Sequence, residues 1–163
     1  MKEFLYDIIK QAGSISLDFR TRLSSLEITK KTDKDLVSAA DLAVEAFLVK
    51  QIHARFPDHA ILGEECGAHG NSIYRWIIDP IDGTTSFVHG QPFYSISIAL
   101  EKQGQIVMGA VNAPVLEELF FAQRGQGAVC NDKSIGVSQR DKIVDSVLGT
   151  GFACLRADLE HNN

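Results

Sequence analysis

One stretch constrains this chain most: an apolar run that ends in two acids, a glycine and two hydroxyl residues. Residues 76–85 read Trp-Ile-Ile-Asp-Pro-Ile-Asp-Gly-Thr-Thr. The isoleucines predict a short buried strand, and Pro80 is expected to stop its ladder because proline has no N–H. Asp79 and Asp82 then lie close together, and carboxylates are ligands that Mg²⁺ takes from proteins. If Thr84 begins a helix, the free N–H groups of the first turn offer a place for phosphate.

The same stretch also fits an ordinary surface turn with Asp79 as a cap, since Asp and Gly are common turn residues. Its place between one predicted strand and the next, at Phe93–Leu100, favours the metal and phosphate interpretation. A second short strand, residues 60–63, also ends in two acids, Glu64 and Glu65. We therefore expect the two strand ends to bring carboxylates together.

Two helices are predicted before these strands. Residues 2–22 place apolar side chains at three- and four-residue spacing, which is typical of an amphipathic helix. Residues 24–37 lose that period and carry several charges, so they are expected to form a solvated connection. Ser38 and Asp41 have the spacing of a capping box. The second helix is thus expected from Ser38 to about Phe56, with Asp41 in its first turn.

The second half of the chain changes to the two-residue period of strands. A hairpin and further short strands are expected at residues 93–100, 106–111, 118–122, 127–130 and 134–137. A last strand is expected at Ser146–Phe152. Two helices followed by such a meander predict an α+β layered fold. Residues 1–145 are assigned to the helix pair and antiparallel sheet, and residues 146–163 to the start of a second α/β portion.

Charge and cysteine content exclude several classes of protein. The 163 residues carry a formal net charge of −5, which argues against sequence-independent nucleic-acid binding. Three cysteines leave one over in any disulfide scheme, so Cys66, Cys130 and Cys154 are interpreted as free thiols of a reducing compartment. The sequence shows neither a signal peptide nor a membrane span, and we expect a cytoplasmic protein. His53 and His59 lack metal-ligand spacing and are expected at the surface or in loops.

Taken together, residues 63–65, 76–85 and 93–100 resemble the inositol monophosphatase family of metal-dependent phosphatases. The sequence Asp-Leu-Val-Ser-Ala-Ala-Asp at 35–41 and the turn Gly-Gln-Gly-Ala at 125–128 are similar to further segments of that family. The resemblance covers nearly the entire chain. It implies the αβαβα sugar-phosphatase fold, of which this chain supplies the helix pair and the antiparallel sheet, truncated before the second sheet.

The resemblance also implies site residues and two or three Mg²⁺ ions. It assigns metal binding to Glu64, Asp79, the Ile81 carbonyl and Asp82. It assigns the orientation or deprotonation of the attacking water to Thr84, Glu64 and Asp41. It assigns substrate binding to Glu64, Ile81, Asp82, and the main-chain N–H groups of Gly83 and Thr84. It places Lys30 or Lys31 in a mobile loop near the site.

The implied activity is hydrolysis of inositol monophosphate to myo-inositol and phosphate by metal-activated water, in a lithium-sensitive homodimer. Histidinol phosphate, fructose bisphosphate and a 3′-phosphoadenosine nucleotide stay open as substrates. The chain departs from the family in lacking the later Trp-Asp motif, whose aspartate completes the second metal site. We therefore expect a truncated chain that is inactive alone, and the alternative is a non-catalytic binding module.

Overall fold

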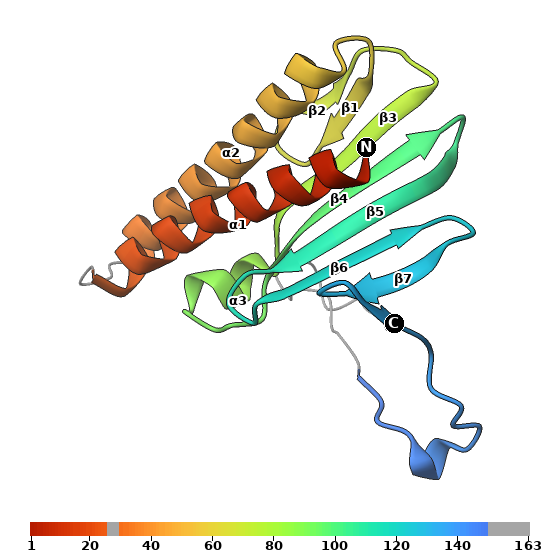
Figure 1. The fold of residues 1–163 in the computed structure, drawn as a ribbon. Helices are drawn as coiled ribbons and strands as arrows, with labels where there is room; N and C mark the ends of the chain where they lie inside the picture. Colours follow the sequence, from red (N-terminus) through yellow and green to blue (C-terminus); the bar gives the residue numbers. More distant parts are fainter. Residues whose placement is uncertain (26–29, 150–163) are drawn as a thin grey trace, which may run out of the picture.

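Two long helices lie side by side across one face of a single sheet (Figure 1). The computed structural model describes residues 1–25 and 30–149, and within these the side chains of residues 1–22 and 39–149. Helix α1 spans Lys2–Ser25 and helix α2 spans Lys30–Arg55. Apolar side chains of both helices pack on the sheet, as their periodicity predicts. The predicted α+β architecture is confirmed.

The described residues form one sheet of eight strands in the order β2-β1-β3-β4-β5-β6-β7-β8. Their bounds are β1 Ala60–Gly63, β2 Gly67–His69, β3 Tyr74–Asp82, β4 Ser95–Lys102, β5 Gln105–Ala113, β6 Glu118–Gln123, β7 Gly127–Cys130 and β8 Lys133–Ile135. From β3 to β8 all neighbours are antiparallel, which confirms the predicted meander. Strand β1 is parallel to β3, so the sheet is mixed rather than purely antiparallel.

Helix α2 begins earlier than its sequence signals predict. Residues 30–37 are helical rather than a loop connection, and Ser38 lies inside the helix rather than at its cap. The prediction failed because a regular spacing of apolar residues shows only that a helix packs against a core. Residues without that spacing can still be helical, and lysine has a helix propensity close to that of alanine. Lys30 and Lys31 therefore begin a helix, and the prediction that they lie in a loop is wrong. Their side chains lie outside the described residues.

Two strand predictions also need correction. Residues 67–69 form strand β2, although the composition of segment 67–72 is typical of a polar loop. The strand forms because its backbone pairs with β1, and the composition of the segment does not show that partner. Residues 146–149 are not in a strand, because an apolar run becomes a strand only beside a neighbour, and no described strand pairs with them. Residues 150–152 of that prediction lie outside the described residues. A 3₁₀ turn spans Ile143–Asp145.

At Gly13, helix α1 packs tightly on strand β5. The amide Nδ2 of buried Asn112, on β5, donates to the Ile9 carbonyl of α1 at 3.0 Å. A Cβ on Gly13 would collide with that amide. A glycine inside a helix is destabilising relative to alanine, but here the missing side chain permits the packing of α1 on β5.

Two buried clusters make up the core. The larger lies between α1, α2 and the sheet, and includes Trp76, Ile98 and Leu100. The smaller consists of Ala40, Ile81, Phe87 and Tyr94, and is called the small core below. It lies next to helix α3, Thr84–Val88, near the end of α1 that is farther from the N-terminus (Figure 1).

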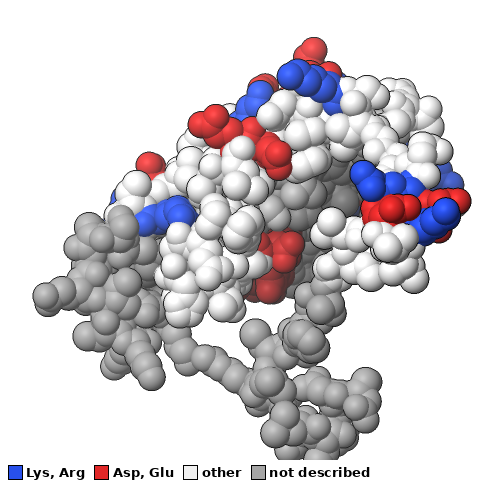
Figure 2. Space-filling model, turned by 90° about the horizontal axis from the view of Figure 1, so that it is seen from below, with Lys and Arg blue, Asp and Glu red and all other residues white. Residues whose placement is uncertain are grey.

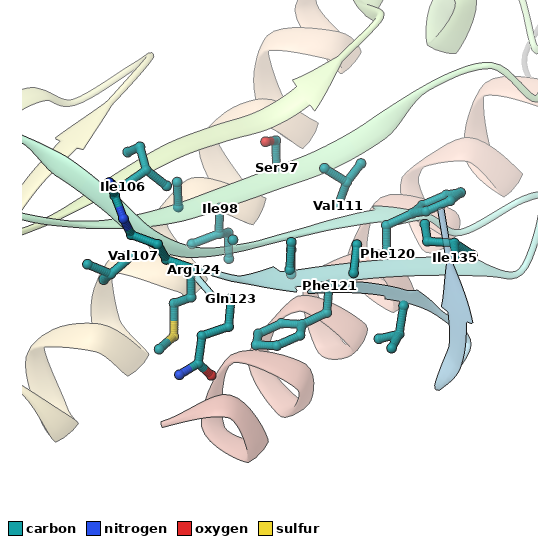
Figure 3. A pocket seen from close by; sticks show the side chains of 17 residues that line it. Ser97, Ile98, Ile106, Val107, Val111, Phe120, Phe121, Gln123, Arg124 and Ile135 are labelled. Atoms are coloured by element: carbon teal, nitrogen blue, oxygen red, sulfur yellow. The ribbon is translucent and has the colours of Figure 1, made fainter. Parts of the chain in front are cut away.

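The opposite side of the sheet carries side chains that no described helix covers. Ser97, Val111 and Phe120 are register partners and share one side, whereas Phe121 belongs to the helix-facing core (Figure 3). An apolar hollow of about 490 Å³ lies along β4–β7, and none of the sequence-predicted site residues lines it. The hollow and the site are therefore different places.

Three expectations from composition can be compared with the structure. Cys66 and Cys130 are free thiols, while Cys154 lies outside the described residues. Among the described helices, none is both long and apolar enough to span a bilayer. His59 lies in the loop before β1, as expected, but it is partly buried there. Its ring stacks between Phe56 and Tyr74 at centroid distances of 4.8 Å, and its Nδ1 accepts a hydrogen bond from Trp76 Nε1 at 3.0 Å.

This hydrogen bond gives a pH prediction. Desolvation lowers the pKa of His59 below its ordinary value, with Asp58 opposing the shift. The unfolded chain therefore binds a proton at His59 more readily than the folded chain does. The contribution of neutral His59 to the free energy of unfolding is fully present above about pH 6.5 and is lost as the pH falls below it. We expect the emission of Trp76, the one tryptophan of the chain, to stay constant above that pH and to change with a midpoint below it.

His59→Phe is the control, because phenylalanine keeps the stacking and cannot titrate. An acid transition of Trp76 emission that is identical in this variant would contradict the assignment.

Candidate functional site

Parallel pairing of β1 with β3 brings two strand ends to the same edge. Gly63 is the register partner of Ile78, so Glu64 and Asp79 follow directly at neighbouring positions. The charge of Glu64 raises the pKa of the Asp79 carboxyl, which places the two side chains close together. The predicted convergence of the two acid-ended strands is thereby found.

The end of β3 changes register at the acids. Asp79 pairs with Ser97 and Asp82 with Ser95, with an irregularity between them that contains Pro80. This agrees with proline interrupting the ladder, although the strand continues to Asp82. The interruption leaves Asp82 exposed and still close enough to Asp79 to raise the pKa of its carboxyl.

Gly83 joins the strand to helix α3. Its φ of 94° lies in the left-handed region, and a Cβ there would lie 2.9 Å from the Phe93 carbonyl oxygen. Only glycine fits both conditions without strain. Thr84 begins the helix as predicted, and its Oγ1 donates to the Ile81 carbonyl at 3.2 Å. The hydroxyl is thus oriented, and its lone pairs stay available to a further donor.

Asp41 reaches the same place from α2. It lies inside the helix with 6% of its surface exposed, so the prediction that it caps a first turn is wrong. Burial raises the pKa of Asp41 to about 7, and the charges of Glu65, Glu64, Asp79 and Glu45 add to the increase. The structure therefore brings Asp41 together with Glu64, Asp79 and, through Asp79, Asp82.

The surroundings of Asp79 suit a carboxylate that binds a cation. Burial raises its pKa to about 6, and the charges of Glu64 and Asp82 act in the same direction. The backbone N–H of Ile81 opposes the shift, whereas the oxygen Oδ1 is buried without a hydrogen-bond partner. A buried acceptor without a partner costs about 1–3 kcal/mol. A cation beside Oδ1 would remove this cost.

Glu45 is a site residue that the sequence interpretation missed. It is 2% exposed, and its two oxygens accept hydrogen bonds from the backbone N–H groups of Glu65 at 3.0 Å and Cys66 at 2.6 Å. A Cβ on Gly63 would collide with its carboxylate. Glu45 therefore holds the turn that carries Glu64. Its position one helical turn after Asp41 is the signal that could have found it, because two acids share the stripe of buried Val44 and Leu48.

The cluster fits a divalent cation by charge and chemistry. Figure 2 shows acidic side chains at the centre of the face seen from below, with basic side chains only toward its margins. The ligands offered are carboxylate and carbonyl oxygens, which suit Mg²⁺. Among the described residues, however, no three His, Cys, Asp or Glu side chains already adopt an arrangement that could hold a metal ion.

The sequence profile of the inositol monophosphatase family matches residues 1–163. An inositol-1-monophosphatase of Mesorhizobium japonicum is 42% identical over 88% of this chain and 54% of its own length. A histidinol-phosphatase of Chlorobaculum parvum is 44% identical over 81% of this chain and 51% of its own length.

Solved structures show the same similarity. The extragenic suppressor protein suhB from Bartonella henselae superposes with a TM-score of 0.75 at 36% identity, over 85% of this chain and 54% of that one. The chain spans about half the length of the curated relatives it matches. From the family profile, the shared fold and the gathered acids of β1, β3 and α2, we conclude that this chain belongs to the inositol monophosphatase family.

Proposed function

We propose that the protein is a Mg²⁺-dependent phosphomonoesterase that hydrolyses inositol monophosphate to myo-inositol and phosphate. The observation that carries the proposal is the buried Oδ1 of Asp79, which lacks a partner while Glu64 and Asp82 lie beside it. Three neighbouring carboxylates repel one another and any phosphate. A divalent cation would satisfy the oxygen and reverse the repulsion.

Glu64, Asp79, Asp82 and the Ile81 carbonyl would hold the two or three ions. When bound, Mg²⁺ lowers the pKa of a water molecule and stabilises the leaving alkoxide. The Ile81 carbonyl accepts a hydrogen bond from Thr84 Oγ1, which ties the hydroxyl to this proposed ligand. A direct in-line attack of water requires no covalent intermediate with the chain.

The other residues bind and orient. The main-chain N–H groups of Gly83 and Thr84 would receive the phosphate, since the first N–H groups of a helix lack partners within it. The left-handed φ of Gly83 supports this, because it lets the backbone approach an anion without a side chain. Thr84 and Glu64 would orient the water. Asp41, with its pKa raised to about 7, is suited to accept a proton near neutral pH.

Histidinol phosphate is the second candidate substrate, because one similar relative is named a histidinol-phosphatase. Inositol and histidinol phosphates share the phosphomonoester and differ in the alcohol. Comparison of kcat/KM for inositol 1-phosphate, histidinol phosphate, fructose bisphosphate and a 3′-phosphoadenosine nucleotide decides between them. The cytoplasmic location and the homodimer that the resemblance implies stay predictions.

The proposal predicts that lithium inhibits the protein by competing for a magnesium position. Phosphate release from inositol 1-phosphate should require Mg²⁺, and lithium at fixed Mg²⁺ should lower it. Colorimetric phosphate assays over a grid of both ions measure this. Release that persists after chelation of divalent ions would refute the metal requirement.

If calorimetry shows that Mg²⁺ binds but none of these four phosphate esters is hydrolysed, the protein is the non-catalytic binding module.

A further inference from the structure

The small core lies directly beneath the residues of the proposed site. Its four members are each 3% exposed or less. Ala40 immediately precedes Asp41, Ile81 lies between Asp79 and Asp82, and Phe87 belongs to α3. The small core thus joins α2, β3 and α3 at the points where each supplies a group to the site, and it forms a cluster distinct from the main core.

Tyr94 ties this small core to helix α1. Its ring meets Phe87 edge to face, with centroids 4.9 Å apart and an interplanar angle of 87°. Its hydroxyl lies 3.1 Å from Oγ of buried Ser16. Because Ser16 Oγ donates its proton to the Gly13 carbonyl at 2.8 Å, Tyr94 is the donor to Ser16.

Arg20 closes the same arrangement one helical turn further along α1. Nη1 donates to the Gln91 carbonyl at 2.6 Å and Nη2 donates to the Gly90 carbonyl, while the guanidinium lies 5.9 Å from the Tyr94 ring centroid. A guanidinium presents such a rigid fork, and lysine does not. One side chain therefore contacts both the loop after α3 and the aromatic ring of the small core.

That loop in turn holds the end of α3. The N–H of Gly90 donates to the Phe87 carbonyl at 3.1 Å, and the N–H of Gln91 donates to the Ser86 carbonyl at 2.8 Å. Helix α3 has five residues, too few to be stable by itself. Its order depends on the strand before it, on Phe87 and on the loop that Arg20 binds.

We infer that Arg20 is a positioning residue: by bridging α1 to the Gly90–Gln91 loop, it fixes α3 and hence the backbone of Gly83 and Thr84 at the site. The inference rests on the proposed function for its catalytic consequence, but not for the ordering of α3. Arg20 itself touches no group of the proposed reaction. Its loss should loosen α3 while the main core, which has separate contacts, stays folded.

The test compares Arg20→Gln and Arg20→Lys in the whole protein, with Arg55→Gln as the matched control. Arg55 also lies over an aromatic ring, 5.7 Å from the Phe56 centroid, but at the end of α2 away from the small core. Hydrogen exchange of the amides of residues 87–91, which include the hydrogen-bonded amides of the end of α3 and its loop, is measured first. We expect exchange about tenfold faster in Arg20→Gln, an intermediate rate in Arg20→Lys, and wild-type exchange in the control.

The catalytic consequence is measured with inositol 1-phosphate and with inorganic phosphate as an inhibitor. Misplacement of the backbone N–H groups should lower kcat/KM by about 10- to 100-fold in Arg20→Gln and weaken phosphate inhibition. Tyr94→Phe, which keeps the ring and loses only the hydroxyl, should retain most activity and so separates the Arg20 bridge from general damage to the small core.

Unchanged exchange of residues 87–91 in Arg20→Gln, or equal losses of kcat/KM in Arg20→Gln and Arg55→Gln, would overturn the inference. A wild-type protein without Mg²⁺-dependent phosphatase activity refutes the proposed function instead. In that event, faster exchange of α3 still supports the bridge and unchanged exchange still overturns it.

Discussion

Replacement of Asp82 by asparagine in the whole protein is expected to lower turnover by about 10³-fold, because loss of several kcal/mol of charge stabilisation in the transition state corresponds to about three powers of ten. The fold should survive. Asp82 is exposed, and its charge raises the pKa of Asp79, so its removal relieves repulsion in the metal-free protein. Glu64→Gln should behave alike, since Glu64 is also exposed and acts on the same carboxyl.

Steady-state assays of phosphate release and thermal unfolding of the same preparations measure both expectations. Asp58→Asn is the control, as Asp58 is an exposed acid in the turn before β1. Near-normal turnover in Asp82→Asn or Glu64→Gln would remove the roles proposed for these residues.

Glu45→Ala is expected to cost about 2–4 kcal/mol of unfolding free energy, because it leaves two backbone N–H groups without an acceptor. The turn that carries Glu64 should become mobile, so Mg²⁺ binding should also weaken. Denaturant unfolding monitored by Trp76 emission gives the free energy, and calorimetry gives the affinity.

The neighbouring variant Glu65→Ala removes an exposed side chain and should change stability by less than about 0.5 kcal/mol. If Glu45→Ala unfolds at the same denaturant concentration as Glu65→Ala, the hydrogen bonds from the turn do not stabilise the fold.

The features that could be predicted from the sequence are those that depend on neighbouring residues. Strand β3, the interruption at Pro80, the turn at Gly83 and the start of α3 at Thr84 all follow from neighbouring residues whose backbone preferences agree. The first helix and the meander follow from periodicity for the same reason. These elements contain most of the residues assigned to the site.

Asp41 shows where local inference fails. Its spacing from Ser38 satisfies a capping box, but the helix continues to Lys30, and Asp41 is buried against other acids. A capping signal describes a single turn of the chain. The packing of this part of α2 also involves the turn after β1, about twenty residues away, whose backbone N–H groups donate to both carboxylate oxygens of Glu45.

The contacts of Arg20 were beyond sequence inference. Its partners Gly90 and Gln91 are 70 and 71 residues away, and both contribute carbonyl groups, which every residue type has. An arginine on a helix is ordinarily a solvated side chain. Only the fold reveals that this one binds the backbone of a distant loop.

The parallel pairing of β1 and β3 has a consequence for how the chain reaches its native state. Four residues of β1 set the register, and a slip by one would turn Glu64 to the other face of the sheet, away from Asp79. A divalent ion that needs both side chains can bind only chains that have paired correctly. By mass action such an ion would favour the native alignment over its misaligned competitors, so the cation would act as a folding cofactor as well as a chemical one.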